Sequence, residues 1–196
     1  MPENDVPLVV PVILGSVRDA RRSHHAARVL HDRLEAAGHE APILDLRELD
    51  LPIFTGADEQ DSHPGVVAFR AALARSDASV WLSPEYNHAY TGAIKNAIDH
   101  VGDELRRKPV AACGLSGAGH GGIRATEALK AVLIEMRALP IRESVHFGDA
   151  RNLFAEDGSL ARPEFNGRVD TMIADLAWHA RALRWARATL PLPDRR

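Results

Sequence analysis

Several residue types and patterns are scarce in this chain of 196 residues, and each scarcity excludes a class of protein. Cys113 is the single cysteine, which excludes an internal disulfide and suits a reducing compartment. No apolar run approaches the roughly 18 residues that span a bilayer. The start, Met-Pro-Glu-Asn-Asp, lacks the basic and apolar regions of a signal peptide. We therefore expect a cytoplasmic protein without a membrane segment.

An excess of positive charge is also missing. The 24 basic and 27 acidic side chains give a formal charge of −3, so no overall electrostatic footprint favours nucleic acid or an anionic membrane. The histidines, among them His24, His25, His31 and His63, show no spacing that specifies a metal site. We therefore predict no metal and no nucleic acid, and any phosphate site has to be local.

Hydrophobic residues make up 45% of the chain, which is enough for one packed core and predicts a single domain over residues 1–196. Short apolar segments alternate with segments of helical periodicity. The expected strands are 8–14, with its better part from Val12, then 41–46, 78–83, 109–115 and 141–146. The expected helices are 23–37, 64–76, 93–101, 123–137 and 165–189. Trp178 and Trp185 share one face of the last helix, where we expect them to pack in the core or in a subunit interface.

This alternation predicts a parallel sheet with helices on both faces. Ligands of such sheets bind beyond the carboxyl ends of the strands, near the point where the strand order reverses. Polar and glycine-rich sequence should therefore follow the first, third and fourth strands. It does so, at residues 15–23, 84–92 and 116–122.

The first of these loops has the composition of a phosphate site. Gly15, Ser16, Arg18, Arg22 and Ser23 precede a predicted helix, whose free N–H groups and positive dipole end favour an anion. The alternative is that Ser23 is only an N-cap and that the arginines are solvated. Both interpretations stay open at this point.

The other two loops have features suited to a flat ring. Pro84, Glu85, Tyr86 and Asn87 follow the third strand directly, with Tyr90 close behind, and they offer backbone donors and aromatic cover. The loop that follows the fourth strand is rich in glycine, which allows a backbone to lie against a ring, although an ordinary strand-to-helix turn would also explain it.

Four motifs, taken in this order, resemble the NADPH-dependent FMN reductase family, a flavodoxin-like group of azoreductases, quinone reductases and chromate-reducing enzymes. The resemblance runs from about Leu8 to His146, and its most specific part is the second motif, which extends without a break into the third. The motifs are Gly15-Ser16-x-Arg18, Ser83-Pro84-Glu85-Tyr86-Asn87-His88, Gly92-x-x-Lys95-Asn96-Ala97-Ile98-Asp99 and Ser116-x-x-Gly119-x-Gly121-Gly122.

The resemblance implies a flavodoxin-like three-layer sandwich with a five-stranded parallel sheet in the order 2-1-3-4-5. It implies FMN as cofactor, with NADPH or NADH as co-substrate. The implied cycle is ping-pong, in which hydride passes through FMN to a quinone, an azo compound, a metal oxyanion or free flavin. FMN carries the chemistry, so no catalytic side chain is expected.

The resemblance also assigns residues and an assembly. Ser16, Arg18 and Ser23 would hold the phosphate, with Arg22 beside them. A dimer or tetramer is implied, in which Tyr90 could face a partner's flavin. Pro84, Glu85, Tyr86 and Asn87 would line the ribityl chain and one side of the ring, and Ser116, Gly119 and Gly122 would approach the other side.

Three other interpretations compete with the reductase. The chain could be an electron carrier that holds FMN without oxidising NAD(P)H, although carriers are often strongly acidic and this chain has a pI of about 6.4. Ser116 could be a hydrolase nucleophile, with His146 or His179 and Asp149 as partners. The glycines at 117, 119 and 122 satisfy a dinucleotide fingerprint, but they follow the fourth strand rather than the first.

Overall fold

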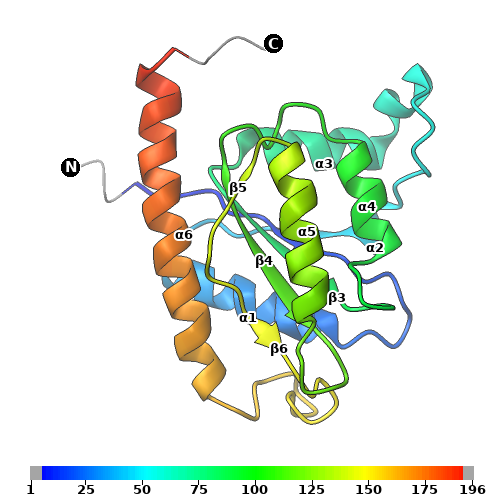
Figure 1. Ribbon diagram of the computed structural model, residues 1–196, viewed down its shortest axis with the longest axis vertical. Helices are drawn as coiled ribbons and strands as arrows, with labels where there is room; N and C mark the ends of the chain where they lie inside the picture. The colour runs from blue at the N-terminus through cyan, green and yellow to red at the C-terminus, as the bar shows by residue number, and fades with distance from the viewer. Residues whose placement is uncertain (1–5, 192–196) are drawn as a thin grey trace.

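The chain forms a parallel sheet with helices on both faces in the computed structural model, which describes residues 6–191 (Figure 1). The strands are β1 (Val12–Leu14), β2 (Ile43–Asp45), β3 (Ser79–Pro84), β4 (Pro109–Leu115), β5 (Leu139–Pro140) and β6 (His146–Phe147). The helices are α1 (Ser23–Ala36), α2 (Leu46–Leu49), α3 (Pro64–Arg75), α4 (Gly92–Asp99), α5 (Ile123–Glu135) and α6 (Glu164–Thr189), with a 3-10 helix η2 (Asp58–Ser62).

The strand order is β2-β1-β3-β4-β5, with every pair parallel, which confirms the predicted topology. Alternate residues of the strands face two separate cores. Val80 and Leu82 of β3 lie in the core that α1 and α6 cover, whereas Trp81 lies in the core that α3, α4 and α5 cover. This arrangement is the expected three-layer sandwich.

The predicted fifth strand over residues 141–146 is wrong in its extent. β5 pairs with β4 just before this segment, and β6 pairs with β4 at its end. Ile141 and Val145 are both buried in the core beneath α1 and α6, and the polar residues 142–144 between them leave the ladder. A continuous strand would direct the side chains of Arg142 and Ser144 to the opposite face of the sheet, and neither side chain is apolar.

Of the two expectations for Trp178 and Trp185, packing in the core is wrong, whereas packing in a subunit interface stays a prediction. Their exposed fractions are 68% and 54%. The buried stripe of α6 contains Val169, Met172 and Leu176, and the two indoles lie on the outer side of the helix. Periodicity correctly places both tryptophans on one face, but it does not say which face the sheet covers.

Within residues 6–191, no helix is both long and apolar enough to cross a membrane.

Candidate functional site

Three loops meet at one edge of the sheet because β1, β3 and β4 are parallel neighbours (Figure 1). We call them the first loop (15–22), the second loop (85–91) and the third loop (116–122). The first two are joined directly, since Thr91 Oγ1 donates to the Gly15 carbonyl at 2.7 Å. The Glu85 amide donates to the Leu115 carbonyl at 3.0 Å and ties the second loop to the end of β4.

Ser23 is the first residue of α1 and not its N-cap. Arg22 occupies the cap position and makes no side-chain cap hydrogen bond. The Ser23 side chain is buried, and its Oγ has no hydrogen-bond partner among residues 6–191. A buried hydroxyl without a partner costs free energy, and this one lies where a 14-residue helix directs free N–H groups and a positive dipole end. The purely structural role for Ser23 as a cap is therefore wrong.

Two cations of the first loop are exposed beside this hydroxyl. Arg18 and Arg22 form no ion pair within the described part of the chain. The Arg18 guanidinium lies 5.9 Å from the centre of the Tyr86 ring. Positive charge is thus available at the helix terminus, and no carboxylate of residues 6–191 pairs with it.

Arg21, which the sequence interpretation passed over, fixes the shape of the first loop. Its guanidinium forms a two-pronged ion pair with Asp45 at the end of β2 and donates to the Ser16 carbonyl at 2.6 Å. A signal was present in the sequence, because Asp45 lies next to the end of the second predicted strand (41–46) and neighbouring parallel strands end at the same edge.

The second loop is built around a tight turn. Tyr86 and Ala89 exchange backbone hydrogen bonds of 3.0 and 3.1 Å, and between them Asn87 and His88 both have positive φ, at 50° and 68°. Positive φ at both central residues defines a type I′ turn, and asparagine tolerates that conformation well. The turn directs the Tyr86 hydroxyl toward the first loop, where it shares a 3.2 Å hydrogen bond with the Ser16 hydroxyl.

The side chain of Glu85 contacts the first turn of α5. Its buried carboxylate pairs with Arg124, whose Nε donates at 2.6 Å and whose backbone N–H donates at 3.2 Å. Burial alone would raise the pKa of Glu85, but the hydrogen bonds and charge of Arg124 outweigh it and lower the pKa below its usual value. The Glu85 side chain therefore positions the start of α5, while the backbone of this residue faces the third loop.

The glycines of the third loop have two different roles. A Cβ on Gly122, whose φ is +81°, would lie 2.7 Å from the Leu115 nitrogen, so this glycine permits close packing against β4. A Cβ on Gly119 would meet nothing within 4 Å, so open space lies in front of its backbone. A flat ring could therefore approach Gly119, and equally Gly117, whose Cβ would also meet nothing within 4 Å.

Ser116 is not arranged as a nucleophile. Its hydroxyl donates to the Ala118 carbonyl at 2.7 Å. Two of the residues considered as its catalytic partners have other interactions. His146 shares a 3.0 Å hydrogen bond with Thr126, and Asp149 forms an ion pair with Arg162. The hydrolase interpretation has no support in this geometry.

Three further predicted site residues are buried or partly buried. Pro84 is buried as the last residue of β3, opposite Leu115. Tyr90 is partly buried and packs against the core beneath α3, α4 and α5. Gly15 is buried at the end of β1, where a Cβ would lie 2.3 Å from Ile94 Cδ1.

Comparison with known proteins identifies a family with this architecture. The family model described as NADPH-dependent FMN reductase matches residues 9–152. A "NADPH azoreductase" from Bacillus sp. (strain OY1-2) is 31% identical over 150 residues, spanning 76% of this chain and 80% of the relative. A "Quinone reductase" from Pseudomonas putida is 31% identical over 173 residues, spanning 82% of this chain and 90% of the relative.

A solved structure has the same fold. The flavoenzyme NAD(P)H:(acceptor) oxidoreductase FerB from Paracoccus denitrificans superposes with a TM-score of 0.77 at 24% sequence identity. The match covers 89% of this chain and 98% of that chain.

Proposed function

Because the chain belongs to the NADPH-dependent FMN reductase family, and is therefore an FMN-dependent NAD(P)H oxidoreductase, we propose that its three loops together hold the FMN. The phosphate would lie at the start of α1 and the ring between the second and third loops. The observation that carries this assignment is the buried Ser23 hydroxyl, which lacks a partner among residues 6–191. A phosphate oxygen is an acceptor that would satisfy it.

The phosphate end of the proposed site combines neutral donors with charge. The hydroxyls of Ser16 and Ser23 would donate hydrogen bonds to the phosphate, as would the first N–H groups of α1. Arg18 and Arg22 would neutralise the phosphate charge from the exposed side of the first loop. The hydrogen bond between Ser16 and Tyr86 supports this role, because it sets the distance between the first two loops before any ligand arrives.

The ring end is lined by backbone and by flat side chains. Pro84, Tyr86 and Asn87 would cover one side, and Ser116 and Gly119 the other, with Gly122 packing beneath them. The ion pair between Glu85 and Arg124 would hold the two loops at a fixed separation. When bound, FMN supplies the hydride chemistry, receiving hydride from NAD(P)H and delivering it to an acceptor in separate half-reactions.

Assembly, acceptor and location complete the proposal. We propose a small-molecule acceptor such as a quinone or an azo compound, in line with the relatives' names. We propose a homo-oligomer, in which the exposed part of Tyr90 could meet a partner. We also propose a cytoplasmic location, which a chain with a single cysteine suits.

Ser23→Ala tests the assignment, with Ser76→Ala as the matched control. Both serines are buried, but Ser76 donates a 2.7 Å hydrogen bond to the Leu73 carbonyl. Loss of a hydrogen bond to a charged group costs about 1.5–3 kcal/mol. We therefore expect Ser23→Ala to weaken FMN binding roughly 10- to 100-fold in a fluorescence titration, without lowering the stability of the FMN-free chain. Ser76→Ala should lower stability and leave FMN binding unchanged.

Equal FMN affinity in wild type and Ser23→Ala would contradict the proposed phosphate site. The reductase activity is measured separately, by bleaching of the bound flavin when NADPH or NADH is added without another protein.

A further inference from the structure

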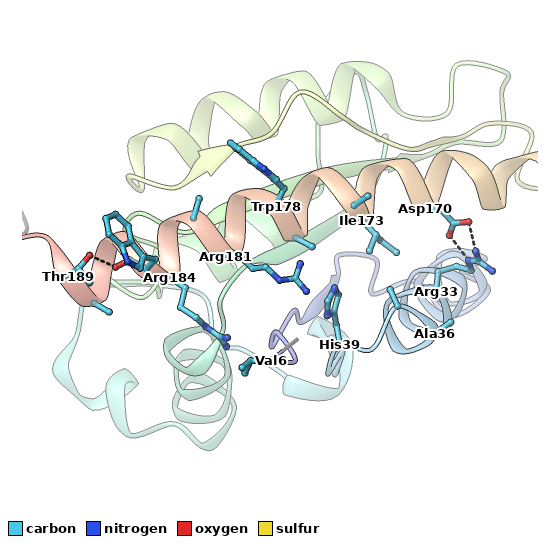
Figure 2. Close-up of a pocket in the computed structure, with 16 residues that line it drawn as sticks. Val6, Arg33, Ala36, His39, Asp170, Ile173, Trp178, Arg181, Arg184 and Thr189 are labelled. Carbon is cyan, nitrogen blue, oxygen red and sulfur yellow. Dashed lines mark hydrogen bonds and ion pairs between the residues drawn. The ribbon is translucent and has the colours of Figure 1, made fainter. Parts of the chain in front are cut away.

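A hollow of about 1150 Å³ lies between α1 and α6, and it shares no residue with the three loops of the proposed flavin site (Figure 2). Clefts of this order of size hold small organic molecules. Small apolar side chains form much of its walls, namely Ala36, Ala37, Ala174, Ala177, Ala182 and Ala188. The hollow is therefore a separate candidate for ligand binding.

His39 lies in this hollow because of the way α1 ends. Gly38 has a φ of +83°, its amide donates to the Glu35 carbonyl at 2.9 Å, and the His39 amide donates to the Leu34 carbonyl at 3.1 Å. These bonds define a Schellman motif, in which the residue after the glycine often makes an apolar contact. Here that residue is a histidine, 6% exposed, whose Nδ1 has no hydrogen-bond partner among residues 6–191. A buried polar atom without a partner costs free energy, which a ligand would recover.

Arg181 lies near the middle of the face of α6 that lines the hollow. At 3.6 residues per turn, Ile173 lies on one side of it and Trp178 on the other. Figure 2 shows the Arg181 side chain extending toward His39, and its Nε is buried without a hydrogen bond within residues 6–191. Burial, and then the charge of Arg181, lower the pKa of His39, so the imidazole is neutral near pH 7.

The other charged side chains of the lining are already paired. Arg33 pairs with Asp170, and Arg184 pairs with Asp77. Arg181 is thus the one arginine of the lining that forms no ion pair among residues 6–191. The hollow contains one uncompensated positive charge beside a neutral imidazole. A carboxylate suits both groups, because one oxygen can accept from the guanidinium and the other from Nδ1 when Nδ1 carries the proton.

Two tryptophans indicate what the carboxylate should be attached to. Trp178 and Trp185 lie seven residues apart on one side of Arg181, and both line the hollow with exposed fractions of 68% and 54%. Each indole offers a flat apolar face on which another aromatic ring can stack. The alanines of the walls leave room for such a ring beside the indoles.

We propose that the hollow between α1 and α6 binds a small planar aromatic carboxylate. Arg181 and His39 hold its carboxylate group, and Trp178 and Trp185 contact its ring. The site goes beyond the proposed function, because it neither contains nor requires FMN.

Isothermal titration calorimetry with 2-naphthoate tests the site on full-length protein saturated with FMN. The proteins are wild type, Arg181→Met, and Arg28→Met as control, since Arg28 is exposed on α1 outside the lining and its substitution removes the same charge. We expect wild type and Arg28→Met to bind with a Kd of roughly 1 mM or tighter, a modest affinity for a ligand of this size. Arg181→Met should bind roughly 10-fold or more weakly, because it loses a charge-assisted contact.

Two further probes separate the charge from the ring. 2-Naphthamide keeps the ring without the charge, so it should bind wild type roughly 10-fold more weakly than 2-naphthoate and should bind Arg181→Met as it binds wild type. This comparison on wild type tests the role of charge even if Arg181→Met does not fold. Octanoate carries the carboxylate on a flexible chain and should bind more weakly than 2-naphthoate.

The variant His39→Phe keeps a ring of similar size without its nitrogens. It should weaken 2-naphthoate binding several-fold, and circular dichroism should show it folded.

The absence of 2-naphthoate binding to wild type would overturn the proposal, because a hollow filled by another part of the protein or by a second copy would not admit the probe. Equal affinity in wild type and Arg181→Met, or tighter binding of octanoate than of 2-naphthoate, would overturn it as well. FMN affinity should be the same in all these chains, so none of these results affects the proposed flavin site.

Discussion

The carboxylate of Glu85 shows how one ion pair can connect two loops of the site. Buried at the end of β3, it would be unstable as a charge without Arg124, and the pair links the second loop to the first turn of α5. Arg21 and Asp45 do the same for the first loop and β2. Each ion pair fixes the position of a loop backbone in the proposed FMN site, and neither pair needs to contact FMN itself.

Stability in acid should report the Glu85 pair. The folded-state pKa of Glu85 is lowered from its ordinary value of 4.5. The stabilisation is therefore present above about pH 4.5 and is lost as the pH falls through the folded-state pKa. We expect the urea-unfolding free energy of wild type to fall more steeply between pH 4.5 and 3 than that of Glu85→Gln. The exposed Glu48→Gln should follow wild type, and identical curves for all three chains would show that the pair contributes nothing.

At the scale of elements, the close approach of β1 to α4 brings the first two loops together. Gly15 ends β1 against Ile94 of α4, and Thr91 caps α4 while donating to Gly15. Thr91 is the N-cap of α4, since its Oγ1 also accepts from the Ile94 amide at 3.2 Å. One threonine and one glycine thus determine where the two loops meet.

Gly15→Ala should disrupt this junction, because its new methyl would lie 2.3 Å from Ile94 Cδ1 and 2.9 Å from the Leu82 carbonyl oxygen. Overpacking of this kind costs about 1–3 kcal/mol. Gly92→Ala, in the first turn of α4, meets nothing within 4 Å and should be neutral or stabilising. Urea unfolding of the two variants gives the comparison, and a Gly15→Ala chain as stable as wild type would mean that α4 yields easily.

At the scale of the whole molecule, the end of the sheet opposite the loops holds a second charged cluster. Asp77 accepts from the Val9 amide at 3.0 Å and pairs with Arg184 of α6, fastening the last helix to the start of the sheet. Lys108 lies nearby and donates to the Leu73 and Ala74 carbonyls at 2.6 and 2.8 Å. These contacts join α3, α6 and the strands into one body.

Lys108 should make the stability of the protein rise with alkaline pH. Burial first, and then the charge of Arg187, lower its pKa from 10.5 to about 8. Between these values the unfolded chain holds a proton that the folded chain has released, so the free energy of unfolding increases with pH. Lys108→Met should remove this increase, as measured by urea unfolding from pH 7.5 to 10.5.

The difference between the wild-type and Lys108→Met profiles is the quantity to compare. Cys113 acts in the opposite direction in both proteins, because its pKa is raised from 9.0 to about 12 on folding. Parallel profiles for the two chains would contradict the role assigned to Lys108.

The sequence alone determined the layered fold and the edge of the sheet at which the three loops of the proposed site meet. Continuous apolar strands alternating with amphipathic helices require a covered parallel sheet, and polar loops after the first, third and fourth strands must then meet at one edge. Local periodicity and chain direction carry this information. The family resemblance rested on the same loops, since their motifs occur in one continuous order.

Only the tertiary structure decided which partners each side chain finds. It left Ser23 without one among residues 6–191, paired Glu85 with Arg124, divided the last strand around residues 142–144, and turned Trp178 and Trp185 outward. These outcomes depend on contacts between residues far apart in the chain. Local propensity leaves several partners open to each of these side chains. Packing and burial decide between them, because these contributions to the free energy arise only when elements far apart in the sequence come into contact.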